Sequence, residues 1–133
     1  MPRYLLDTNI ISELVRNPLG KIRDHIAEVG EKSICTSIIV AGELRFGARK
    51  KGSKRLSSQL EVILSAIEII PFEEPFDRQY ANLRCALEIA GTPIGPNDLL
   101  IAAQTVSMGY ILVTANYKEF RQVQGLAVEN WLL

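Results

Sequence analysis

The sequence has few of the residues that mark metal cages, disulfide scaffolds or membrane anchors. Only two cysteines and one histidine occur among its 133 residues. Cys35 and Cys85 lie in apolar runs without metal-type spacing, so we expect two buried, inert thiols in a reducing cytoplasm. No apolar run approaches the ~20 residues that cross a bilayer, so no membrane attachment is expected.

The chain also lacks an excess of charge of either sign. Fifteen Lys and Arg residues balance fifteen Asp and Glu residues. The field of the whole protein therefore does not attract nucleic acid, and such binding needs a local patch. Apolar residues make up 47 % and charged residues 23 % of the chain, which excludes intrinsic disorder and predicts one folded domain over residues 1–133.

Short apolar runs of strand length alternate with longer stretches of helical periodicity. The predicted strands cover residues 4–6, 33–36, 67–71, 111–114 and, at the sheet edge, 127–129. The predicted helices cover residues 8–16, 20–29, 37–50, 56–66, 75–91 and 97–109, with a short helix before the last strand. Ser37 and Asn97 are predicted helix caps. Such alternation predicts an α/β fold, a three-layer α/β/α sandwich around a central, mostly parallel sheet.

Two acidic residues stand where such a fold concentrates function. Open parallel sheets bind ligands beyond the carboxyl ends of their strands. Asp7 directly follows the apolar run 4–6, and Asp98 precedes the apolar run 99–103 in the first turn of a core-facing helix. Each also has a simple structural interpretation, because Asp7 can cap a helix and Asp98 can interact with a helix dipole.

Glu43 lies inside the predicted helix over residues 37–50. The residues three and four positions away are apolar or small: Ile39, Val40, Phe46 and Gly47. This spacing predicts a carboxylate on the buried face, where it needs a cation or several donors. A salt bridge to Arg45 or Arg84 is the alternative.

The fold can bring these three carboxylates into one polar pocket. Clustered carboxylates repel one another unless a hard cation lies among them. Magnesium suits a few carboxylates together with retained waters. The sequence therefore predicts a Mg²⁺ site built from Asp7, Glu43 and Asp98.

A basic segment follows Glu43 on the same helix and the loop after it. Its six cations are Arg45, Arg49, Lys50, Lys51, Lys54 and Arg55. Such side chains can steer a polyanion through phosphate contacts, which are independent of base sequence and weaken with salt. A solvated helix end is the alternative.

In order and spacing, these motifs resemble PIN domains of the bacterial VapC toxin type. The resemblance rests on the stretches 5–11 (LLDTNII), 41–44 (AGEL) and 94–103 (IGPNDLLIAA). It continues through residues 113–116, 119–120 and 129–131, and so covers essentially the whole chain.

The resemblance implies a metal-dependent endoribonuclease, the toxin of a type II toxin–antitoxin pair. In that family the residues matching Asp7, Glu43 and Asp98 hold divalent metal, and a fourth polar or acidic residue follows the last core strand. That position is Asn116 here, where many members carry Asp, which favours one firmly bound Mg²⁺, with Mn²⁺ as the alternative ion. Supporting residues near the pocket are predicted to be Thr8, Asn9 and Thr114.

The expected reaction is hydrolysis of an RNA phosphodiester, with Asp7 and Asp98 as metal ligands and Glu43 as general base. In-line attack by water would leave a 5′-phosphate. The only histidine, His25, is expected at the surface, so the paired-histidine mechanism of metal-free ribonucleases is excluded. The resemblance further implies tRNA, including initiator tRNA, as substrate. It also implies an antitoxin that binds operator DNA, and a homodimer or a toxin–antitoxin hetero-oligomer.

Two other classes compete with this interpretation. Aspartate-nucleophile phosphatases and phospho-acceptor receivers are also α/β sandwiches with an Asp at the first strand tip. The phosphatases need a second Asp where this chain has Asn9, and the receivers need one at the end of the third strand, where residues 70–72 are Ile-Pro-Phe. A PIN-like domain that only binds RNA or a partner is the third possibility, because Asn116 departs from the fuller acidic set.

Overall fold

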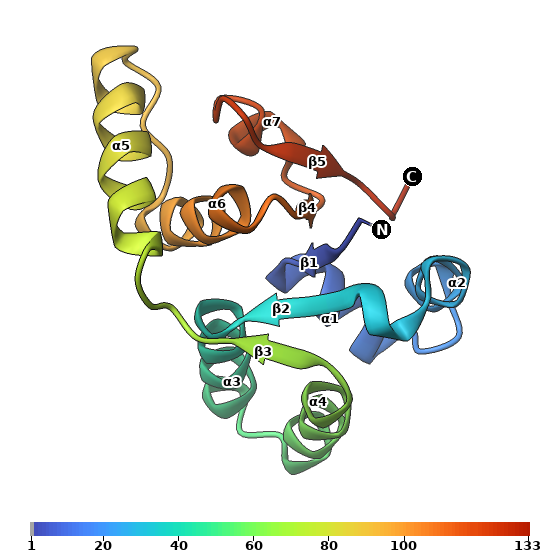
Figure 1. Cartoon of the computed structure of the whole chain (residues 1–133). Helices are drawn as coiled ribbons and strands as arrows, with labels where there is room; N and C mark the ends of the chain where they lie inside the picture. The colour runs from blue at the N-terminus through green and yellow to red at the C-terminus, as the bar shows by residue number, and fades with distance from the viewer. Residues whose placement is uncertain (1) are drawn as a thin grey trace.

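A computed structural model describes residues 2–133 (Figure 1). Its strands are β1 (Tyr4–Leu6), β2 (Ile34–Ser37), β3 (Glu68–Ile70), β4 (Ile111–Val113) and β5 (Ala127–Glu129). Its α-helices are α1 (Thr8–Arg16), α2 (Lys21–Val29), α3 (Ile38–Lys51), α4 (Lys54–Ala66), α5 (Phe76–Ile89), α6 (Pro96–Met108) and α7 (Tyr117–Phe120). A 3₁₀ turn, η1 (Glu31–Ser33), leads into β2 and was not predicted.

The five strands form one sheet in the order β3-β2-β1-β4-β5, and all neighbouring pairs are parallel. The chain first builds the sheet outward from β1 to β3 and then returns to place β4 on the other side of β1. This switch point lies between β1 and β4, where parallel sheets bind ligands beyond the strand ends. The residues directly after these two strands are Asp7 and Thr114.

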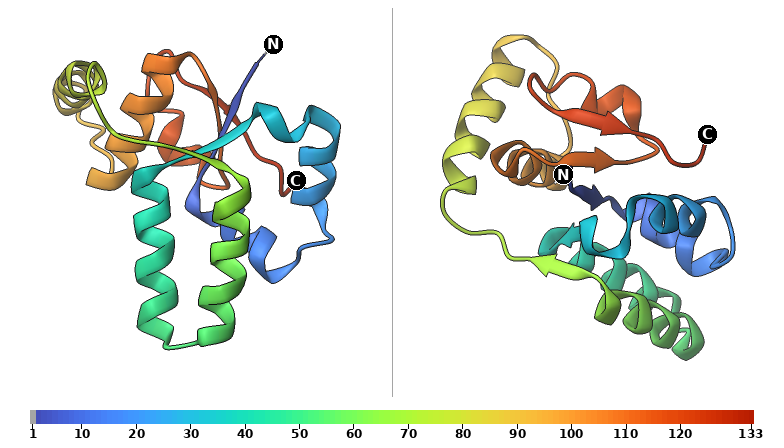
Figure 2. Two further views of the ribbon diagram at one scale, coloured as in Figure 1. Left: turned by 60° about the horizontal axis from the view of Figure 1, so that its bottom comes forward. Right: turned by 45° about the vertical axis from the view of Figure 1, so that its right-hand side comes forward.

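Helices cover the sheet on both sides, which confirms the predicted three-layer sandwich (Figures 1 and 2). Helices α1 to α4 contact one another and form one layer, and α3 and α4 make a hairpin that extends away from the sheet. On the other side α5 packs against α6. No helix within residues 2–133 is long and apolar enough to span a membrane.

Strands β1 and β4 are apolar along their whole length because both of their faces are covered. Leu5, Leu6, Leu112 and Val113 have no exposed surface. Burial of each such side chain contributes about 1.5–3 kcal/mol to folding. The edge strand β3 is only partly buried. The two strands that flank the switch point are thus anchored in the core.

The start of α6 differs from the prediction. The helix begins at Pro96 with Gly95 as its N-cap, and no side chain caps it. Proline suits the first helical position, since its missing N–H has no partner there in any case. Asn97 is therefore free of a capping role, and its side chain reaches Glu43 instead.

Two further expectations about single residues are wrong. Cys35 is buried, which raises the pKa of its thiol to about 12, but Cys85 is exposed. The apolar stripe of α5 consists of Phe76, Leu83 and Leu87, and Cys85 lies off that stripe. His25 is half-buried rather than at the surface, because its ring stacks on buried Trp131 at a centroid distance of 4.9 Å.

Candidate active site

Asp7 lies at the carboxyl end of β1 and is 2 % exposed. Its Oδ1 accepts the Thr8 backbone N–H at 2.8 Å, so Asp7 is also the N-cap of α1. The predicted capping role of Asp7 is therefore confirmed. Its Oδ2 accepts the Thr114 hydroxyl at 2.8 Å. Burial raises the pKa of Asp7, and the hydrogen bonds from Thr114 and Thr8 oppose that rise. The carboxylate is thus held in one orientation.

Thr114 is the centre of the network that orients Asp7. Its hydroxyl donates its one proton to Asp7 and accepts the Asn116 backbone N–H at 3.0 Å and the Asn9 side-chain amide at 3.4 Å. The donor and both acceptor positions of this buried hydroxyl are therefore used. The Asn9 carbonyl oxygen accepts the Ala115 N–H at 3.0 Å, which ties α1 to the end of β4. The three predicted supporting residues do surround Asp7.

Asp98 stands in the first turn of α6 and shares a hydrogen bond with Glu119 of α7. Burial raises the pKa of Asp98 to about 7, and the bond to Glu119 and repulsion by Glu119, Asp7 and Glu43 add to that rise. Burial also acts to raise the pKa of Glu119, but the net shift is downward because Asp98, the Gly95 N–H and Asn116 donate to it. Asp98 thus holds the shared proton near neutral pH.

Glu43 approaches the same cluster from α3. Its Oε2 accepts the Asn97 side-chain amide at 3.2 Å. Its Oε1 is buried and has no hydrogen-bond partner among residues 2–133. The alternative of a salt bridge is wrong, because Arg45 pairs with Glu61 at 3.0 Å and Arg84 with Glu88 at 2.9 Å.

The sequence predicted that Glu43 lies on a buried face of its helix together with Phe46 and Gly47, and this is only partly right. Glu43 and Gly47 are half-buried, but Phe46 is 68 % exposed. Helix α3 packs on the core through other positions, Val40, Ala41, Leu44 and Ala48. Glu43 therefore lies at the edge of the buried face, where its carboxylate can reach both the cluster and solvent.

Glu119 is the site residue that sequence reasoning did not select. It follows Asn116 by three residues, and in a short helix that spacing brings both side chains to one face. The Asn116 amide donates to Glu119 Oε2, and the Gly95 N–H donates to Oε1 at 2.8 Å. The predicted fourth residue thus positions an acid, and Glu119 provides the fourth carboxylate beside Asp7, Glu43 and Asp98.

The donor set fits a hard divalent cation. Within residues 2–133 no group of three or more Asp, Glu, His or Cys side chains lies close enough together to hold a metal ion by itself. Magnesium does not require such an enclosure, because one or two carboxylates and several waters satisfy it. A bound cation would offset the repulsion between carboxylates that adds to the raised pKa of Asp98. It would also give the buried, unpartnered Oε1 of Glu43 a partner.

Within residues 2–133, one cation of the basic segment forms an ion pair and five do not. Arg45 makes two hydrogen bonds to Glu61 of α4, both at 3.0 Å. The other members have no ion pair within the part of the chain that the structure describes: Arg49, Lys50, Lys51, Lys54 and Arg55. The Lys50 ammonium lies 6.0 Å from the centre of the exposed Phe46 ring.

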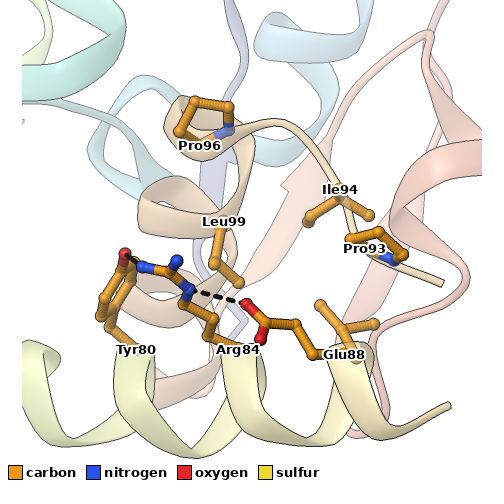
Figure 3. Close-up of a pocket in the computed structure, with 8 residues that line it drawn as sticks. Tyr80, Arg84, Glu88, Pro93, Ile94, Pro96 and Leu99 are labelled. Atoms are coloured by element: carbon orange, nitrogen blue, oxygen red, sulfur yellow. Dashed lines mark hydrogen bonds and ion pairs between the residues drawn. The ribbon is translucent and has the colours of Figure 1, made fainter. Parts of the chain in front are cut away.

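A separate hollow of about 270 Å³ lies between α5 and the segment that leads into α6 (Figure 3). Arg84 crosses it, donating to Glu88 at 2.9 Å and to the Tyr80 hydroxyl at 3.0 Å. The rest of its lining is mainly apolar, with Ile94 and Leu99 facing the hollow. Because it contains none of the four clustered carboxylates, it is not the candidate active site.

The fold and the cluster define the class: an α/β/α domain with a carboxylate site at the switch point of a parallel sheet. The family profile described as "PIN domain" matches residues 4–126. Ribonuclease VapC2 of Rickettsia felis is 38 % identical over 96 % of this chain and 97 % of its own length. The tRNA(fMet)-specific endonuclease VapC of Shigella flexneri is 31 % identical over 98 % of this chain and 99 % of its own.

Solved structures agree with these relatives. The toxin chain in the crystal structure of VapBC2 from Rickettsia felis bound to a promoter DNA fragment superposes with a TM-score of 0.87, at 38 % identity over 96 % of this chain and 98 % of that chain. This chain therefore belongs to the PIN-domain family and, within it, to the VapC ribonucleases. The resemblance seen in the sequence is confirmed, and the phosphatase and receiver alternatives are set aside.

Proposed function

We propose that the protein hydrolyses RNA at the carboxylate cluster with a divalent cation, Mg²⁺ or in its place Mn²⁺. The observation that carries this proposal is the convergence of four carboxylates, from the end of β1 and from α3, α6 and α7, at the switch point of the sheet. A bound Mg²⁺ ion supplies charge that polarises a phosphoryl oxygen and lowers the pKa of a bound water.

Asp7 and Asp98 are the residues that would hold the ion. Asp7 is oriented by Thr8 and Thr114, so little freedom is lost when it binds. Asp98 must first release the proton that it shares with Glu119. Glu119 stays fixed meanwhile by the Gly95 N–H and the Asn116 amide.

Glu43 is placed to handle the proton of the attacking water. The Asn97 amide holds Oε2 and leaves the buried Oε1 unpartnered. An unpartnered carboxylate oxygen can orient a water and accept its proton as the water attacks phosphorus. In-line attack would leave the phosphate on the 5′ side of the downstream product.

The binding partners that we propose are inferred from those of the similar proteins. The Rickettsia felis and Salmonella typhimurium VapBC structures contain DNA, and the Shigella flexneri relative is named for initiator tRNA. We extend this to a cognate VapB-like antitoxin for the present protein, to operator DNA bound through it, and to tRNA as the substrate in the cytoplasm. Assembly would be a homodimer or a toxin–antitoxin hetero-oligomer.

The test is incubation of the antitoxin-free protein with total tRNA, in Mg²⁺ and in EDTA, with mapping of new 5′ ends. Discrete cuts that require both the metal and Asp7 are expected, with Asp7→Asn inactive. Asp77→Asn is the matched control, because Asp77 is an exposed acid in the first turn of α5. Cutting that persists in EDTA or in Asp7→Asn would contradict the proposal.

A further inference from the structure

Helix α3 contains two interior glycines that its own fold does not require. Glycine lowers the stability of a helix interior relative to alanine. Neither Gly42 nor Gly47 has a positive φ. Apart from the adjacent residues and the nearby backbone of α3 itself, no atom lies within 4 Å of the position that a Cβ would take at either residue. Alanine would therefore fit at both positions and strengthen the helix.

The surroundings of the two glycines differ. Gly47 is half-buried and lines a cavity of about 280 Å³ between α1, α3 and α4. Gly42 is exposed and does not line this cavity. The step of five residues from 42 to 47 turns the helix by about 140° beyond one full turn, so the two positions face different directions. Only Gly47 can make room for something that occupies the cavity.

The cavity borders the candidate active site and shares Glu43 with it. Glu43 and Thr8, which neighbours Asp7, belong to its lining at one end. Glu43 contributes to both places, and its Oε1 is buried without a partner among the described residues. An occupant of the cavity would therefore lie next to the carboxylate cluster.

The lining suits one nucleoside of an RNA strand. Leu56 and Leu60 offer an apolar surface for a base, Ser12 offers a hydroxyl for the sugar, and Lys51 offers a cation for a phosphate. Lys51 has no ion pair in the described part of the chain. The volume is near the lower end of the roughly 300–1,000 Å³ typical of ligand pockets, so the cavity accepts a single unit. Proteins that recognise single-stranded RNA bind its unstacked bases individually.

We propose that this cavity receives one unstacked nucleoside beside the cleaved phosphate, and that glycine at position 47 lets the strand lie against the backbone of α3. The inference rests on the proposed function and names the place where the substrate binds. A methyl group on residue 47 would project into the cavity and displace the strand. The same methyl group on residue 42 would not.

The experiment compares Gly47→Ala with Gly42→Ala, each in the wild-type protein and in Asp7→Asn. Thermal unfolding should show that both substitutions raise Tm, by roughly 1–5 °C. Fluorescein-labelled total tRNA, titrated into the Asp7→Asn proteins in Mg²⁺, should bind about tenfold more weakly to the Gly47→Ala form, a loss of about 1.4 kcal/mol. Gly42→Ala should change neither binding nor tRNA cleavage.

The outcomes separate this inference from the function on which it rests. Gly47→Ala that binds and cleaves tRNA like the wild type would overturn the inference alone. Loss of antitoxin binding by Gly47→Ala without loss of tRNA binding would also overturn it, because the cavity would then belong to a protein partner. Wild-type protein that neither binds nor cleaves tRNA would overturn both proposals.

Discussion

At the scale of single residues, the proton shared by Asp98 and Glu119 controls the energetics of the candidate site. The pKa of Asp98 is about 7 in the metal-free protein, above its ordinary value of 3.8. A carboxyl with a raised pKa contributes stability that is complete below its ordinary pKa and is lost as the pH rises through the folded value. The metal-free fold should therefore lose this contribution between about pH 4 and pH 7.

Asp98→Asn should make the metal-free protein more stable at pH 8. The amide can still donate to Glu119, as the protonated carboxyl does, but it carries no charge to be buried beside Asp7 and Glu43. We expect a gain of about 1–2 kcal/mol in the free energy of unfolding at pH 8 and little gain at pH 5. Urea denaturation in EDTA at both pH values measures it. A variant that is less stable than the wild type at pH 8 would show that Asp98 is not a repelled carboxyl.

At the scale of elements, the sequence could predict the strands and helices because their apolar periods are clear. It predicted Asp7 and Asp98 as site residues because both stand next to such elements. It could not select Glu119, since that choice depends on how α7 turns back toward Gly95 and Asn116. Nor could it place Phe46, because the period of α3 is compatible with more than one buried face.

The hairpin of α3 and α4 divides the predicted RNA-contacting cations into two kinds. Arg45 is held by Glu61, so it links the two helices, whereas Arg49 is exposed and has no ion pair in residues 2–133. Arg49→Ala should weaken tRNA binding and reduce the slope of log affinity against log salt by about one. Arg45→Ala should change this slope less and lower the free energy of unfolding by about 0.5 kcal/mol, as an exposed pair does.

Fluorescence anisotropy with labelled tRNA at several salt concentrations measures both slopes, and urea denaturation measures both stabilities. Arg45 and Arg49 stand on the same helix one turn apart, so each is the control for the other. Equal effects of the two substitutions on the slope would show that the ion pair between Arg45 and Glu61 breaks when RNA binds. No effect of either would remove this helix from the RNA-binding surface.

At the scale of the whole molecule, a chain without net charge concentrates negative charge at one end of its sheet. The topology forces this, because the parallel strands β1 and β4 end side by side and α3, α6 and α7 add their acids there. The apolar core supports the arrangement, since Leu6 and Val113, the last residues of β1 and β4, have no exposed surface. The clustered carboxylates therefore repel one another in the metal-free protein, and a bound cation would offset this repulsion.

We therefore expect Mg²⁺ to stabilise the protein independently of any RNA. A ligand that binds only the folded state adds about 2.7 kcal/mol at a hundred times its dissociation constant. Saturating Mg²⁺ should therefore raise Tm by several degrees over EDTA, measured by differential scanning calorimetry at pH 8. Asp7→Asn should lose most of this rise, because it removes a ligand, and Asp77→Asn should keep it. An equal rise in all three proteins would mean that Mg²⁺ acts elsewhere on the surface, and the cluster would then be balanced by the Asp98 proton alone.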